Sequence, residues 1–330
     1  MERVRDNAKW HLFCPHECPG LSDVYGDNFK TLYEKYESEG KSRKIVNARE
    51  LWFKILDAQM ETGTPYLLFK DACNEKSNQS NLGTIYSSNL CAEIVEYTSQ
   101  DETAVCNLAS IGLPSFVMNN NTIDYLELGR ITRILVRNLN KLIDSNYYTT
   151  ECAHNSNTLH RPIGIGVQGY ADVFALLSIP WESEEARELT EEISACIYYN
   201  AMYESCELAK ERGAYSSFPG SPMSQGVFQF DMWGLKENDL SGFWDWNELK
   251  KDVAKWGVCN SLFTAQMPVA SSAKITGSYE MTEPAHSAIF NRRVVGGEIM
   301  IVNKYLINDF EKIGIWCEDL KNEIIINEGS

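Results

Sequence analysis

Three side chains of different chemistry stand at alternate positions in one short polar segment. Asn89, Cys91 and Glu93 supply an amide, a thiol and a carboxylate. In an extended segment alternate side chains point to one side, so the three groups are expected to converge. The amide can hold a hydroxyl group and the carboxylate can take its proton. The thiol can act as a nucleophile or, after one-electron oxidation, abstract a hydrogen atom.

Taken alone, this trio has a plain alternative, because the same residues arise together by chance and an isolated cysteine more often packs in a core. A second thiol, Cys106, follows among apolar neighbours that suggest a buried or half-buried strand or turn, and spacing does not show whether it meets Cys91. The run MPVASSA at 267–273 places small hydroxyl residues where a helix start could face phosphate. An ordinary strand-to-helix turn with serine caps explains that run better on its own.

The surrounding elements follow from hydrophobic periodicity. Apolar spacing predicts helices at 48–60, 125–143 and 184–212, with Gly213 as the stop of the last. Apolar runs at 65–69, 163–167 and 262–269 predict strands buried on both faces, which together with long helices favours a parallel α/β fold. Polar segments are expected to form loops at 74–81, 149–157, 216–225 and 277–287. One domain, or one piece of a larger domain, is the simplest organisation.

Composition excludes several classes of protein. A net charge of -16 over 330 residues disfavours nucleic-acid binding. No apolar run is long enough to span a membrane, and the N-terminus lacks the apolar core of a secretory signal, so a cytoplasmic location is expected. Ten cysteines are too dilute for a disulfide-stapled scaffold.

Two motif-like spacings carry no cofactor. Cys14 and Cys18 have no second pair at zinc spacing, so no metal site is expected. Gly164, Gly166 and Gly169 lie in an apolar run, which favours close strand packing, or substrate approach to a barrel strand, over a dinucleotide-binding loop.

The run from Asn81 through NLCAEIVEYTSQDETAVCNLAS resembles the finger-loop region of class I ribonucleotide reductase large subunits of the eukaryotic and viral type. Four further segments resemble that family in the same order along the chain: CPHECPGL at 14–21, ETGTPYLLFKD at 61–71, HRPIGIGVQG at 160–169 and MPVASSA at 267–273. Ala92 and Ser272 stand where threonine is common in the family. The resemblance implies part of a ten-stranded α/β barrel with an interior finger loop.

The resemblance also implies a role for each candidate residue. Cys91 would become the thiyl radical that removes the ribose 3′-hydrogen, Glu93 would take the proton of the 3′-hydroxyl, and Asn89 would hold the sugar hydroxyls. Cys106 would be one of two reducing thiols. The substrate diphosphate would bind at Val269, Ala270, Ser271 and Ser272. The expected activity is ribonucleoside-diphosphate reduction, which supplies deoxyribonucleotides for DNA replication.

Against a full-length large subunit, residues 1–330 are expected to lack half of the barrel, the regulatory region and the C-terminal tail. The isolated chain is therefore expected to be inactive and to need complementing large-subunit segments, with a homodimer as the complete assembly. No cofactor is expected on this chain, because the radical would come from the metal-containing small subunit and reductant from thioredoxin or glutaredoxin. The alternative is a non-catalytic module that binds a reductase subunit.

Overall fold

The computed structural model describes residues 1–240, 242–280, 282–285, 287–294 and 296–329, and it divides into two compact units. Unit 1 comprises residues 1–105, 148–160 and 216–236, and unit 2 comprises 106–147, 161–215 and 237–330. The described residues contain no helix long and apolar enough to cross a membrane.

Unit 1 is built from short helices and one antiparallel strand pair. Its elements are α1 (Glu2–Arg5), β1 (Lys9–Leu12), α2 (Gly26–Ser38), β2 (Lys44–Asn47), α3 (Ala48–Thr62), α4 (Lys70–Glu75), α6 (Glu151–His160), η2 (Met223–Gln225) and α9 (Gln229–Met232). The predicted helix at 48–60 is confirmed as α3. Asn47 caps its first turn by accepting from two backbone N–H groups, and Gly63 ends it in the left-handed conformation with φ 74°.

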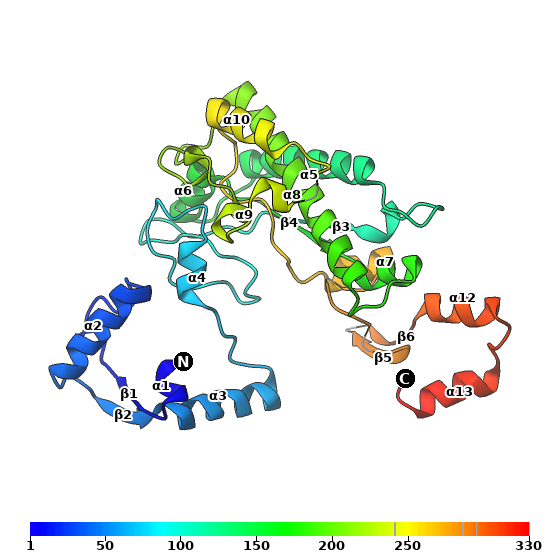
Figure 1. Ribbon diagram of the computed structural model, residues 1–330, viewed down its shortest axis with the longest axis horizontal. Helices are drawn as coiled ribbons and strands as arrows, with labels where there is room; N and C mark the ends of the chain where they lie inside the picture. The colour runs from blue at the N-terminus through cyan, green and yellow to red at the C-terminus, as the bar shows by residue number, and fades with distance from the viewer. Residues whose placement is uncertain (241, 281, 286, 295, 330) are drawn as a thin grey trace. The chain divides into compact units, whose positions relative to one another are not determined.

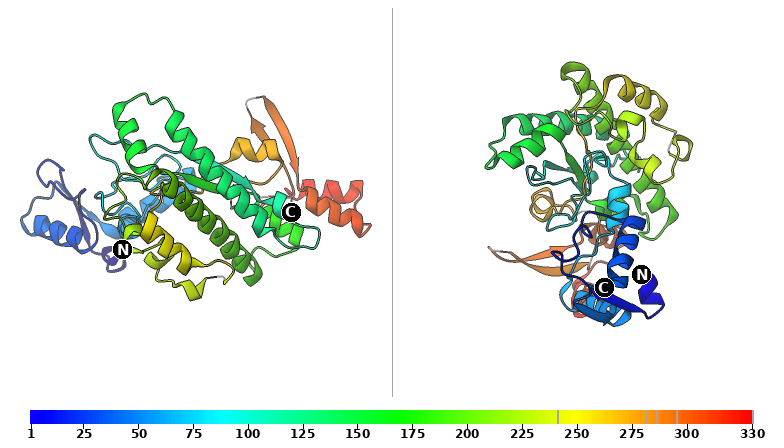
Figure 2. Two further views of the ribbon diagram at one scale, coloured as in Figure 1. Left: turned by 90° about the horizontal axis from the view of Figure 1, so that it is seen from above. Right: turned by 90° about the vertical axis from the view of Figure 1, so that its left-hand side faces the viewer.

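Unit 2 carries the long helices and the parallel strands. Its elements are β3 (Leu108–Gly112), η1 (Leu113–Phe116), α5 (Tyr125–Ser145), β4 (Gly164–Gln168), α7 (Tyr170–Leu177), α8 (Glu184–Arg212), η3 (Glu237–Asp239), α10 (Trp246–Trp256), α11 (Ala270–Thr276), β5 (Ile289–Val294), β6 (Gly297–Val302), α12 (Lys304–Lys312) and α13 (Glu318–Ile326). The predicted helices at 125–143 and 184–212 are confirmed as α5 and α8, and α8 stops before Gly213. These two helices pack side by side (Figures 1 and 2).

The strands of unit 2 explain the glycines of the run at 163–169. β3 and β4 pair in parallel from Leu108 opposite Gly164 to Gly112 opposite Gln168. A Cβ on Gly164 would lie 2.6 Å from a methyl carbon of Leu108. One on Gly166 would meet the backbone oxygen of Ala265. The predicted close strand packing is therefore confirmed, and it fixes the register of the pair.

Two of the three expected strands need correction. Residues 65–69 form no strand, and Tyr66, Leu67, Leu68 and Phe69 are all exposed. Pro65 has no N–H to donate, and no strand pair among the described residues includes this segment. The segment 262–269 runs parallel to β4 through a single bridge between Ile165 and Thr264. Its residues alternate between buried and exposed from 263 to 269, so it is covered on one face only.

The loop expected at 149–157 is also wrong, because most of it belongs to α6. This helix buries polar side chains: Asn157 donates to the Tyr148 hydroxyl, and His160 contacts Glu102 and Ser217. A polar segment whose partners are distant in sequence has no apolar periodicity to reveal it. Of the other expected loops, 74–81 begins inside α4, 216–225 contains η2, and 277–287 includes positions 281 and 286, which lie outside the described residues.

The coarse fold prediction is confirmed: the chain mixes helices with parallel strands in an α/β arrangement. The described residues form no closed barrel, since their strands occur in three separate pairs. Inside unit 2 the fully buried apolar side chains include Leu128 and Val136 of α5 and Ile193 and Met202 of α8.

Candidate functional site

Asn89, Cys91 and Glu93 lie on a tight turn in unit 1. The extended segment expected here is wrong at its centre, because the N–H of Ala92 donates to the Asn89 carbonyl at 3.1 Å and Ala92 has φ 65°. The turn still brings the two polar ends together: Asn89 Nδ2 donates to Glu93 Oε2 at 2.7 Å. Ile94 N–H donates to Asn89 Oδ1 at 3.1 Å. The amide and the carboxylate therefore converge, and Cys91 lies between them in the chain.

The thiol of Cys91 differs in exposure from most other cysteines. All ten cysteines lie within the described ranges, and three of them, Cys91, Cys106 and Cys317, are exposed. By contrast, burial raises the pKa of Cys196 and of Cys206 to about 12, so those thiols stay protonated and unreactive. The two cysteines selected from the sequence are therefore among those that a substrate or an oxidant can reach.

Cys106 lies in unit 2, two residues before β3, and its side chain is exposed, so the buried or half-buried position expected for it is wrong. The next residue, Asn107, is buried, and its side-chain Nδ2 donates to the Pro162 carbonyl at 2.8 Å. Its backbone carbonyl accepts from Gly164 N–H at 2.9 Å. The exposed thiol thus precedes a residue that is bonded to the neighbouring strand through both its backbone and its side chain.

The proposed phosphate turn also belongs to unit 2. Val269 is the N-cap of α11 and is buried, whereas Ala270, Ser271 and Ser272 are exposed in the first helical turn. No side-chain cap is present at this N-cap, so the alternative of serine capping is wrong. The exposed hydroxyls are donors and acceptors that a ligand can use.

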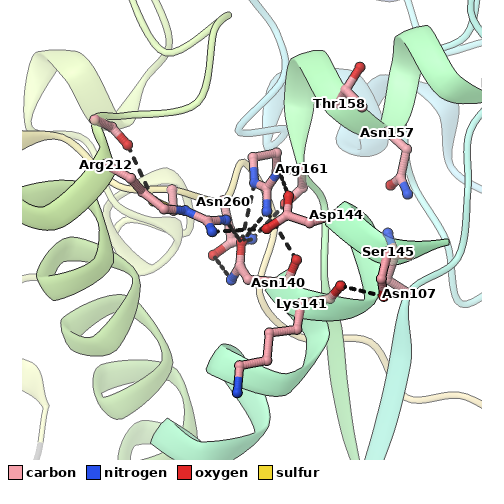
Figure 3. A network of polar contacts seen from close by, with 12 residues as sticks. Asn107, Asn140, Lys141, Asp144, Ser145, Asn157, Thr158, Arg161, Arg212 and Asn260 are labelled. Atoms are coloured by element: carbon pink, nitrogen blue, oxygen red, sulfur yellow. Dashed lines mark hydrogen bonds and ion pairs between the residues drawn. The ribbon is translucent and has the colours of Figure 1, made fainter.

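A polar cluster at the start of β4 has no counterpart in the sequence analysis (Figure 3). Arg161 Nη1 donates to Asp144 Oδ1 at 2.6 Å, and Arg212 Nη1 donates to Asp144 Oδ2 at 2.9 Å. Burial favours the neutral form of Asp144, but bonds and charges from Arg161 and Arg212 outweigh it and lower the pKa of the carboxyl. Asn140 Oδ1 accepts from both guanidinium groups and from Asn260 Nδ2.

Sequence reasoning also missed Glu96, which lies in the finger-loop run of unit 1. Its side chain is buried, and burial raises the pKa of its carboxyl to about 8, partly offset by a hydrogen bond with the Val105 backbone. The carboxyl is therefore mostly protonated at neutral pH. The sequence contains one signal for a buried carboxyl here, because an acidic residue directly follows the apolar pair Ile94 and Val95.

The chain is therefore an α/β protein whose candidate residues are an exposed thiol in each unit and, in unit 1, a hydrogen-bonded amide and carboxylate. The entire chain, residues 1–330, matches the family model for the ribonucleotide reductase barrel domain. The chain belongs to this family.

Relatives of known name agree with this assignment. The chain is 54% identical to the ribonucleoside-diphosphate reductase large chain of Neurospora crassa and 54% identical to that of Cryptosporidium parvum. It is 53% identical to the large subunit from Danio rerio. Each match covers 100% of this chain but only 35%, 41% and 41% of the relative, respectively. The chain therefore spans well under half the length of these relatives.

Proposed function

We propose that this chain is the catalytic barrel portion of a ribonucleoside-diphosphate reductase large subunit. The observation that carries the proposal is the turn at 89–93, where an amide and a carboxylate are hydrogen-bonded on either side of an exposed thiol. Family membership supports it, because the matched relatives are named as large subunits of this reductase. In the complete subunit the parallel strands would belong to a ten-stranded barrel, with the turn at the tip of an interior finger loop.

The chemistry divides among the named residues. Cys91, as a thiyl radical, takes the 3′-hydrogen atom of the ribose, and Glu93 accepts the proton of the 3′-hydroxyl while Asn89 holds the sugar hydroxyls. The 2′-hydroxyl then leaves as water. Cys106 and a partner thiol supply two electrons and two protons and become a disulfide, and the 3′-hydrogen returns from Cys91. The net change converts a ribonucleotide and a dithiol into a deoxyribonucleotide, a disulfide and water.

Substrate and partners follow from the same proposal. The ribonucleoside diphosphate would place its phosphates at Val269, Ala270, Ser271 and Ser272, where hydroxyls are exposed at the start of α11. The small subunit would supply the radical from its metal site, and thioredoxin or glutaredoxin would return the disulfide to two thiols. The remaining large-subunit segments would supply the partner thiol, and the complete assembly would be a homodimer. Alone, the chain would not turn over.

Complementation tests this function. The chain is mixed with polypeptides covering the rest of a large subunit and with a radical-bearing small subunit, and deoxycytidine diphosphate formed from labelled cytidine diphosphate is measured. Turnover in the full mixture, and none when this chain is omitted, is the expected result. Stable binding to the other polypeptides without any turnover would overturn the proposal and leave the chain as an interaction module.

A further inference from the structure

The thiol of Cys106 is exposed. Disulfide formation demands a narrow geometry, with an S–S distance of about 2.05 Å and Cβ atoms about 3.5–4.5 Å apart. A side chain with one rotatable bond before its sulfur reaches that geometry only if its backbone is fixed. The residues bonded to the backbone beside Cys106 therefore contribute to where its sulfur lies.

Asn107 extends the pairing of β3 and β4 by one residue before the first residue of β3. The regular ladder begins at Leu108 opposite Gly164, and Asn107 precedes it. The carbonyl of Asn107 accepts from Gly164, and its Nδ2 donates to the carbonyl of Pro162 at 2.8 Å. The side chain thus supplies an additional rung next to Cys106, and its burial excludes competing water.

The acceptor of this rung is itself held firmly. Pro162 follows Arg161, whose backbone has φ 46° and whose carbonyl accepts from Asn260 Nδ2 at 2.8 Å. The Arg161 guanidinium is bonded to Asp144 and Asn140, as Figure 3 shows. Charge-assisted bonds of this kind are about twice as strong as neutral ones. The Pro162 carbonyl is therefore a fixed point within unit 2.

We propose that Asn107 is a positioning residue for the Cys106 thiol, anchored through Pro162 to the cluster formed by Arg161, Asp144 and Asn140. This inference rests on the proposed function, since it assigns Asn107 to the step in which Cys106 forms a disulfide. Asn107 itself touches no reacting atom. Its role is to keep the backbone next to Cys106 at one place relative to β4.

The first test uses the full 330-residue chain and needs no enzymatic activity. Asn107→Leu keeps the side-chain size but removes the donor, and hydrogen–deuterium exchange is followed in the peptide covering 104–110. The loss of one buried hydrogen bond should raise its exchange rate about five- to tenfold. Asn200→Leu is the matched control, because Asn200 is equally buried in unit 2 but bonds Arg133 and the Cys196 carbonyl. The control should leave this peptide unchanged.

The second test uses the complemented reductase. Positioning of the reducing thiol affects the chemical steps and not nucleotide binding, so Asn107→Leu should lower kcat about tenfold or more and leave KM within about twofold. Asn200→Leu should leave both values within about twofold. Asp144→Asn, on a half-exposed residue, should weaken the anchor and give a smaller rise in exchange of the same peptide even if Asn107→Leu fails to fold.

Two outcomes would overturn the inference. One is unchanged exchange at 104–110 in Asn107→Leu and in Asp144→Asn. The other is an equal fall of kcat in Asn107→Leu and Asn200→Leu. An assembly with wild-type sequence that shows no turnover would instead contradict the proposed function, and the exchange measurement would still decide whether Asn107 orders the segment that carries Cys106.

Discussion

The two segments that carry the candidate thiols are held in opposite ways. Cys91 lies on a turn closed by its own neighbours, because Asn89 bonds Glu93 and Ile94, and Ser88 Oγ donates to the Ile94 carbonyl at 2.6 Å. Cys106 precedes a strand that is fixed by residues far away in the chain: Asn107 bonds Pro162, and Arg161 bonds the cluster on α5 and α8.

This difference matches the work proposed for each thiol. A local turn keeps the thiol, the carboxylate and the amide together while the segment itself stays exposed to substrate. A long-range anchor keeps a reducing thiol at a fixed place beside the β3–β4 pair, where a second thiol would meet it. Changes in the first segment should therefore affect chemistry more than stability, and changes in the second anchor should affect both.

The largest effect is expected at Cys91. Cys91→Ser removes the only group of the turn that can carry a sulfur radical, so reduction in the complemented assembly should fall more than about 1,000-fold. Nucleotide affinity, measured by equilibrium binding, should stay within about twofold. Cys317→Ser is the control, since Cys317 is also an exposed thiol but lies before α13. Residual turnover in Cys91→Ser comparable to that of the control would exclude Cys91 from the mechanism.

The next effect concerns the anchor of the second segment. Asn140 is fully buried, and its Oδ1 accepts from Arg161, Arg212 and Asn260. Asn140→Leu keeps the volume but leaves these donors without their acceptor, which should cost about 3 kcal/mol in the free energy of unfolding. Urea unfolding followed by tryptophan fluorescence measures this change. A loss below about 1 kcal/mol would show that the cluster does not stabilise unit 2.

The same contrast explains what could be predicted from the sequence. Helices α3, α5 and α8 were predictable because periodicity and end residues such as Asn47 and Gly213 are local signals. The bond between Asn89 and Glu93 is also local, whereas the catalytic role of the trio at 89–93 stays a prediction. The Arg161 cluster was not, because its members come from four distant segments and each alone resembles an ordinary polar residue.

The wrong strand predictions have a related cause. An apolar run indicates that a segment packs against a partner, but it does not identify that partner. The run at 65–69 therefore resembled a buried strand, although it is exposed here. Helix α6 was missed in the opposite way, because its buried polar residues are satisfied by Tyr148, Glu102 and Ser217. Long-range pairing decides both cases, and single-residue properties do not encode it.

A pH-dependent effect is expected at Glu96, which bonds the residue before Cys106. Its pKa is about 8 in the fold against an ordinary value of 4.5, so the folded carboxyl keeps a proton that the unfolded chain releases. This proton stabilises the fold fully below pH 4.5, and the contribution is lost as pH rises to about 8. Glu96→Gln cannot ionise, so its stability relative to wild type should increase by on the order of 3 kcal/mol between pH 5 and pH 8.

Thermal unfolding across that pH range measures the effect. Glu75→Gln, at an exposed position in unit 1, should follow the wild-type profile. Parallel profiles for wild type and Glu96→Gln would contradict a buried, protonated carboxyl at this position.

The smallest change in stability is expected at Asn89, where the comparison between the two segments is sharpest. Its bonds are local and half-exposed, so water can replace them, and Asn89→Ala should cost about 1 kcal/mol or less in the free energy of unfolding. Turnover in the complemented assembly should nevertheless fall about 10- to 100-fold, because Glu93 loses the amide that orients it beside the ribose. A comparison of the free energies of unfolding of Asn89→Ala and Asn140→Leu separates the local bonds of the turn from the long-range bonds of the anchor. A stability loss as large as that of Asn140→Leu would mean that the turn is part of the structural core, and its exposed thiol would then need a different explanation.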